Sequence, residues 1–149
     1  MSLADHDRPL NDRGKRNAPE MGRRIHQKGI SPELLLTSSA KRAKSTAKRI
    51  AKEIGYPHEK ILITSKLFHG GTNSIIEVIK SLDNKLNVVM IFGHNPGFTT
   101  CANALAGTSI SNIPTCGIVS INLKIQSWDE TLPGIGDLQF FDFPKNIQN

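Results

Sequence analysis

Features that define several large classes of protein are missing from this sequence of 149 residues. It has only two cysteines, Cys101 and Cys116, too few and too irregularly spaced for a disulfide framework or a zinc site. No apolar run approaches the roughly 18 residues that span a bilayer. Neither a glycine-rich nucleotide-binding motif nor a Gly-x-Ser-x-Gly elbow occurs. We therefore expect no membrane span, no metal, no cofactor and no serine hydrolase chemistry.

The composition is that of an ordinary globular domain. A length of 149 residues suits one domain, spanning residues 1–149. The N-terminal residues Met1–Asp7 lack the basic and then apolar order of a signal peptide, so we expect a cytoplasmic protein. The net charge of +6 favours anionic partners. Nucleic acid is an unlikely partner despite the basic stretch Lys41–Lys52, because aromatic residues are only 5% of the chain and no known binding module occurs.

The most informative stretch is an apolar run, Val88–Phe92, that ends at Gly93 and His94. Such a run predicts a strand buried on both faces of a sheet that helices cover. Small and apolar residues resume after Pro96, so a helix is predicted to begin near Pro96 or Gly97. His94 then lies at the carboxyl end of a strand and beside a helix N-terminus, where parallel α/β sheets bind ligands. The alternative is a histidine that only caps the turn.

A second stretch repeats this arrangement. The apolar run Leu34–Leu36 leads to Ser38 and Ser39, either of which can cap the next helix. That helix has one apolar stripe, formed by Ala43, Ala47, Ile50 and Ile54. Arg42 lies in its first turn, off the stripe, where a guanidinium can reach over the strand end and bind a phosphate. The alternative is an arginine that faces solvent.

Together, the two stretches predict a cationic pocket at one edge of a sheet. His94 and Arg42 would line it with helix N–H groups, and no carboxylate is expected there. Preorganised donors of this kind stabilise the negative charge of a phosphoryl group. The sequence therefore predicts a phosphate site.

The remaining segments complete an α/β pattern. Asn11 or Asp12 is predicted to cap a helix that Pro19 either kinks or divides. Ser74 and Glu77 have the spacing of a helix capping box. Three further strands are predicted, the last two as a hairpin: Ile61–Ile63, Ile118–Ile125 and Leu138–Phe143.

Three motifs, in this order and spacing, resemble those of the histidine phosphatase superfamily: Arg8–Gly14, Thr37–Ala47 and Gly93–Gly97. The small, single-domain phosphohistidine phosphatases of the SixA type are the most similar group. The resemblance implies a three-layer α/β/α sandwich of the phosphoglycerate mutase type, with a mostly parallel central sheet and an antiparallel C-terminal edge hairpin. It also implies that Arg42 and His94 are catalytic and that Arg8, Arg42, His94 and Asn95 bind phosphate.

One element of the family is not found in the sequence. In the family, a first strand ends in an Arg-His pair, and this histidine attacks phosphorus to form a phosphohistidine intermediate. No Arg-His pair occurs in these 149 residues, and His6 has no strand before it, so we expect no nucleophile here and little turnover. Three explanations stay open: a start codon assigned too late, an expressed fragment begun deliberately at Asp5, and loss of catalysis in this lineage.

The resemblance therefore predicts a phosphohistidine phosphatase that lacks its first strand and, in full-length form, acts on a phosphorylated signalling protein. A small phosphate compound is a second candidate substrate. If another copy replaced the missing strand, the protein would be a dimer. The alternative function is a non-catalytic module that binds phosphate or phosphoprotein.

Overall fold

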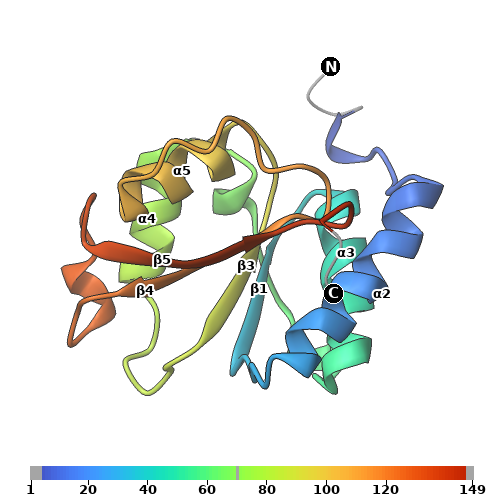
Figure 1. The fold of residues 1–149 in the computed structure, drawn as a ribbon, viewed down its shortest axis with the longest axis horizontal. Coiled ribbons are helices and arrows are strands. Elements are labelled where there is room, and N and C mark those ends of the chain that lie inside the picture. Colours follow the sequence, from blue (N-terminus) through green and yellow to red (C-terminus); the bar gives the residue numbers. More distant parts are fainter. Residues whose placement is uncertain (1–4, 70, 147–149) are drawn as a thin grey trace.

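The computed structural model describes residues 5–69 and 71–146 and has helices on both sides of a parallel sheet (Figure 1). The helices are α2 (Asp12–Gln27), α3 (Lys41–Ile54), α4 (Thr72–Lys80) and α5 (Gly97–Ala106). The strands are β1 (Leu34–Ser38), β2 (Leu62–Thr64), β3 (Val89–Phe92), β4 (Ile118–Leu123) and β5 (Gly136–Asp142). None of the described helices is both long and apolar enough to cross a bilayer.

The parallel sheet has the order β2-β1-β3, so β1 is its central strand. The strands β4 and β5 pair antiparallel as a separate two-stranded sheet, with an irregularity in register between Ser120 and Ile121. The predicted α/β class, the mostly parallel sheet and the C-terminal hairpin are all confirmed.

Two hydrophobic clusters hold the layers together, one on each face of the sheet. Leu35 of β1 packs with Ala43, Ala47 and Ile50 of α3 on one face. Its neighbour Leu36 packs on the other face with side chains of α4 and α5, including Ile75. Because side chains alternate along a strand, adjacent leucines serve opposite layers. Figure 1 shows the result, with α2 and α3 on one side of β1 and β3, and α4 and α5 on the other.

Side-chain capping sets the start of α2 but not the start of α4. The side chain of Asn11 accepts a hydrogen bond of 2.8 Å from the Gly14 amide and so caps α2, as predicted. Pro19 lies inside α2 without dividing it. The predicted capping box at Ser74 is wrong, because α4 begins after Gly71 and the Ser74 hydroxyl donates to the carbonyl of Lys66 instead.

The strand β3 is less enclosed than its sequence predicts. Val89, Met90 and Ile91 are only partly buried, and Val88 just before the strand is 39% exposed. Among the described residues β3 pairs with β1 alone, so one of its edges has no neighbouring strand. The run is apolar enough for an interior strand, but here it forms an edge of the sheet.

Candidate functional site

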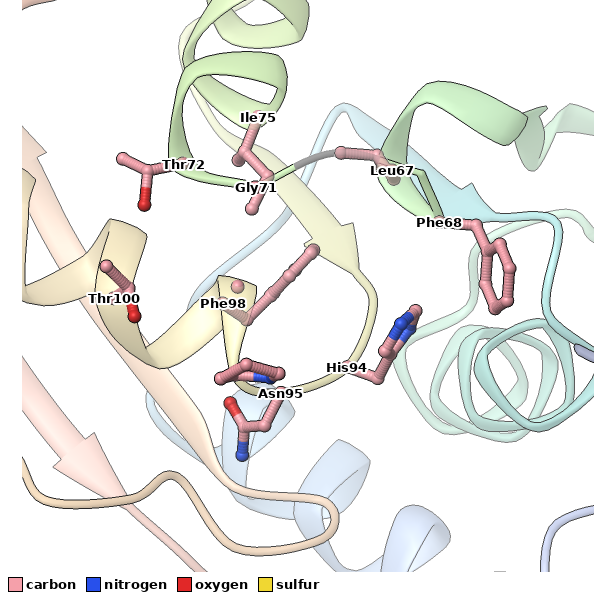
Figure 2. A pocket seen from close by; sticks show the side chains of 11 residues that line it. Leu67, Phe68, Gly71, Thr72, Ile75, His94, Asn95, Phe98 and Thr100 are labelled. Atoms are coloured by element: carbon pink, nitrogen blue, oxygen red, sulfur yellow. The ribbon is translucent and has the colours of Figure 1, made fainter. Parts of the chain in front are cut away.

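His94 lies in the loop between β3 and α5, where its ring points toward Phe68 (Figure 2). The two ring centroids are 5.0 Å apart. The loop is close to α5 because Gly93 has no side chain, and a Cβ at this position would overlap the ring of Phe98. The Nδ1 atom of His94 is buried and has no hydrogen-bond partner among the described residues. A buried and unpaired ring nitrogen can receive a hydrogen bond or donate one to a bound ligand.

Burial lowers the pKa of His94, and the positive charge of Arg42 lowers it further, against a smaller opposing effect of Asp5. Both effects favour the neutral imidazole in the free protein. A bound dianion would favour the protonated ring, so we expect anion binding to take up protons when it occurs near the pKa of His94.

Arg42 is the second residue of α3, directly after the carboxyl end of β1. Its side chain is 25% exposed and lines the same cavity as His94, with a volume of about 990 Å³. The predicted pair thus shares one cavity at the carboxyl ends of two adjacent parallel strands.

The group that contacts Arg42 was not predictable from the sequence. Asp5 accepts two hydrogen bonds from the guanidinium, through its carbonyl at 2.7 Å and through its carboxylate at 3.3 Å. The hydrogen bond and charge of Arg42 hold the pKa of the Asp5 carboxyl below its usual value. No carboxylate was expected beside Arg42, and Asp5 supplies one there. The contact spans 37 residues of sequence, and no local pattern marks it.

Arg8 and Asn95, the other two predicted phosphate contacts, differ in whether their side chains are available to bind an anion. Arg8 is exposed, and its charge contributes to the lowered pKa of Asp5, so it lies within electrostatic range of the pair. The Asn95 amide donates to the side chain of Asn112 and to the carbonyl of Ile113, and its oxygen accepts from Thr99. These bonds use the whole hydrogen-bonding capacity of the Asn95 side chain, which ties the site loop to α5.

Three histidines surround the ring of Phe68. His6 and His69 each make an edge contact with it, with centroid distances of 4.8 and 4.9 Å, and His94 makes the third contact. His6 also hydrogen-bonds Ser39 at 2.9 Å. The sequence offered no reason to bring His6 near His94, because its contacts come from loops far away in the chain.

A second, smaller cavity of about 240 Å³ adjoins His94 at the N-terminal end of α5. Thr72 and Thr100 face it from α4 and α5 (Figure 2). In the described part of the chain, no three His, Cys, Asp or Glu side chains gather as metal ligands would. The guanidinium of Arg42 and the imidazole of His94 supply the site with hydrogen-bond donors and positive charge.

Comparison with known proteins shows a similarity to one protein family in the N-terminal part of the chain. Residues 3–64 match the model of the histidine phosphatase superfamily (branch 1). An uncharacterised chloroplastic protein of Arabidopsis thaliana is 28% identical over 138 residues, which are 87% of this chain but only 63% of that protein. An uncharacterised protein of Mycobacterium leprae is 28% identical over 130 residues, covering 81% of this chain and 78% of that protein.

Solved structures extend the similarity over nearly the whole chain. A SixA protein of Nakamurella multipartitia has a TM-score of 0.83 at 19% identity and covers 95% of this chain and 87% of its own. The protein histidine phosphatase SixA, solved in complex with tungstate, has a TM-score of 0.82 at 20% identity. The match covers 97% of this chain and 89% of the SixA chain. A mycobacterial glucosyl-3-phosphoglycerate phosphatase has a TM-score of 0.64 at 13% identity, and the match covers 91% of this chain and 88% of that chain. The fold is that of the phosphoglycerate mutase type.

Proposed function

We propose that this chain carries the phosphate-binding part of a phosphohistidine phosphatase site. The match of residues 3–64 to the histidine phosphatase superfamily supports this proposal. The observation that supports this most directly is the cavity shared by Arg42 and His94 at the carboxyl ends of β1 and β3. A guanidinium offers two parallel hydrogen bonds to a tetrahedral anion, and an imidazole offers one more. Both residues also match positions in the family motifs.

Each proposed residue has a separate role. Arg42 binds phosphoryl oxygens, and His94 donates a hydrogen bond to the transferring group. Arg8 adds positive charge near Asp5. Asn95 holds the loop that carries His94, since its own amide already has partners.

The covalent step needs a histidine from an Arg-His pair, which these 149 residues do not contain. Where such a histidine is present, it attacks phosphorus, so that a new N–P bond forms while the bond to the substrate nitrogen breaks. Water then attacks phosphorus and releases inorganic phosphate and the free histidine. We propose a phosphorylated signalling protein in the cytoplasm as the substrate, because the domain is small and its described residues form no long insertion that would enclose a sugar phosphate.

Thermal protection by tungstate tests the proposed site, because an anion that binds only the folded protein stabilises it. At a concentration of about 100 times Kd the stabilisation is about 2.7 kcal/mol. We expect His94→Ala and Arg42→Ala each to remove most of this protection. The measurement is the melting temperature with and without tungstate.

Matched controls come from α2, where His26 and Arg16 are exposed. The variants His26→Ala and Arg16→Ala should keep full protection by tungstate. Each removes the same kind of side chain as its test variant, but at a position that does not line the cavity. Equal protection in all four variants would show that tungstate binds elsewhere and would refute the site. Binding of a phosphoprotein that Arg42→Ala abolishes, without turnover of an aryl phosphate, would favour the binding-module alternative for this chain.

Asp5 competes with a bound anion for Arg42, so removing Asp5 should strengthen tungstate binding, whereas removing Arg42 or His94 should weaken it. Asp5→Ala removes a carboxylate that holds the guanidinium and repels phosphate. We expect tungstate to bind about two- to fivefold more tightly, as is typical when one exposed charge contact is removed. The measurement is the tungstate Kd by calorimetry.

The matched control for this prediction is Asp137→Ala, which breaks an exposed ion pair with Lys124 on the hairpin. Its tungstate Kd should not change. Weaker binding in Asp5→Ala would mean that Asp5 orients Arg42 for the anion instead of competing with it.

A further inference from the structure

The helix α3 carries a row of lysines on its outer face. The members are spaced three or four residues apart, which an α-helix places one above the other: Lys41, Lys44, Lys48 and Lys52. Three of them are exposed, and Lys44 is partly buried. At a rise of about 1.5 Å per residue, the row is about 16 Å long. We call it the lysine row.

The other faces of α3 are packed against the rest of the molecule. Its buried side chains, including Ala47 and Ile50, pack with Leu35 of β1. The helix α2 covers a further side, where Gly22 lies close to Ile50. Because α3 is fixed on these sides, its lysine row is held at one place on the surface of the molecule.

The charges of the lysine row are not balanced within the described residues, where no ion pair involves any of the four side chains. The first turn of α3 has no acidic residue, and the charge of Lys41 there opposes the helix dipole. Lysines four residues apart also repel each other. On α2, by contrast, Glu20 pairs with both Arg23 and Arg24. The lysine row therefore weakens its own helix, and an anionic partner would offset that cost.

The lysine row leads to the candidate phosphate site. Its first member, Lys41, directly precedes Arg42, which lines the cavity shared with His94 at the carboxyl end of β1. A partner that lay along the row would therefore reach this cavity with one of its ends. The row has no aromatic side chain on which the bases of single-stranded nucleic acid could stack. Carboxylates on one face of a partner helix have the same spacing as the lysines and can meet them one to one.

We propose that the lysine row docks an acidic helix of the phosphorylated protein whose phosphoryl group enters the site of Arg42 and His94. This inference rests on the proposed function, but it concerns a surface outside the cavity, which none of the four lysines lines. The row attracts and orients the partner, and the cavity binds its phosphoryl group. Recognition of the substrate is thus divided between two surfaces, one for its negative charge and one for its phosphate.

The test uses two helical peptides of about 16 residues, each with a phosphoserine at one end in place of the phosphorylated residue. One peptide has four glutamates at four-residue spacing, and the other has glutamines at the same positions. We expect the chain to bind the glutamate peptide about tenfold more tightly at low salt, as the sum of four exposed charge pairs. The preference should fall to about threefold in the double variant Lys44→Gln/Lys48→Gln, because half of the pairs are gone. The measurement is the Kd of each peptide by fluorescence anisotropy.

The matched control is Lys85→Gln/Lys124→Gln, which removes two exposed lysines outside α3 and the same net charge. It should keep the full preference for glutamate. An equal reduction in both double variants would indicate a general effect of charge and would overturn the proposal. So would equal binding of the two peptides by the original chain. Tighter binding of a single-stranded DNA of about 16 nucleotides, weakened by Lys44→Gln/Lys48→Gln, would also overturn it, because the row would then be a nucleic-acid surface.

Tungstate separates a failure of this proposal from a failure of the proposed function. The variant Lys44→Gln/Lys48→Gln should keep full thermal protection by tungstate, because neither lysine lines the cavity. Equal binding of the two peptides by a chain that tungstate still protects would refute the lysine row alone. If tungstate did not protect the original chain, the proposed function would fail. A glutamate preference that remained would then belong to an acidic partner without phosphate, which overturns the proposal as stated.

Discussion

Arg24→Ala is expected to destabilise the fold by about 3 to 5 kcal/mol, the cost typical of removing one partner from a buried ion pair. Arg24 of α2 donates to Asp142 of β5 at 3.1 Å, and to the carbonyls of Phe143 and Pro144 at 3.0 Å each. The side chains of Arg24 and Asp142 are only 11% and 4% exposed. The substitution leaves the Asp142 carboxylate buried and without its countercharge. The measurement is the free energy of unfolding in urea at pH 7.

The neighbouring variant Arg23→Ala is the matched control. Arg23 also pairs with Glu20, but its side chain is 51% exposed, so the loss should stay below about 1 kcal/mol. If both variants lost the same amount, the link between α2 and β5 would not be a stabilising contact.

The effect of Arg24 also has a defined pH dependence. Burial alone would raise the pKa of Asp142, but hydrogen bonds from Asn146, the Phe143 amide and Arg24 outweigh it and lower the pKa below 3.8. A carboxyl whose pKa is lower in the folded state contributes stability above pH 3.8 and loses it as the pH falls through the folded value. The difference between the original chain and Arg24→Ala should therefore shrink in that acidic range.

Leu35→Ala is expected to cost about 2 to 5 kcal/mol, the range for truncating a large core side chain. Leu35 is fully buried in the central strand β1. Its neighbours Ala43 and Ala47 are too short to move into the space, because their Cβ atoms are fixed to the helix backbone. The cavity should therefore persist. The measurement is again the urea unfolding free energy.

The control is Leu62→Ala in the paired strand β2. Leu62 is 54% exposed, so its truncation should change stability by no more than about 0.5 kcal/mol. An equal loss at both positions would contradict the assignment of Leu35 to the centre of the core.

The elements of this fold were largely predictable from local patterns. The run Leu34–Leu36 and the stripe from Ala43 to Ile54 each predicted the correct element, as did the strands predicted at Ile118–Ile125 and Leu138–Phe143. The capping box at Ser74 failed because the helix began earlier, after Gly71. A capping motif states only a local preference, and here the hydroxyl has a different partner in a preceding turn.

The candidate site was partly predictable. That His94 and Arg42 would share an edge followed from two parallel strands, each ending in a polar turn, and the structure places both in one cavity. Their roles in phosphate binding stay predictions. The carboxylate of Asp5 on Arg42 and the three histidines around Phe68 were not predictable, because those contacts join segments far apart in the sequence.

By itself, the sequence determined the order and type of the elements, since the spacing of apolar residues dictates which backbone conformation can bury them. It also determined that a guanidinium and an imidazole follow the first and third parallel strands along the chain. Only the tertiary structure decided what each of these groups contacts and where the sheet is interrupted. The physical reason is that hydrogen bonding and burial depend on distances between segments, whereas a local pattern constrains only its own segment. For that reason Val89–Phe92, composed like an interior strand, has one edge with no neighbouring strand among the described residues, and this edge borders the cavity of about 990 Å³.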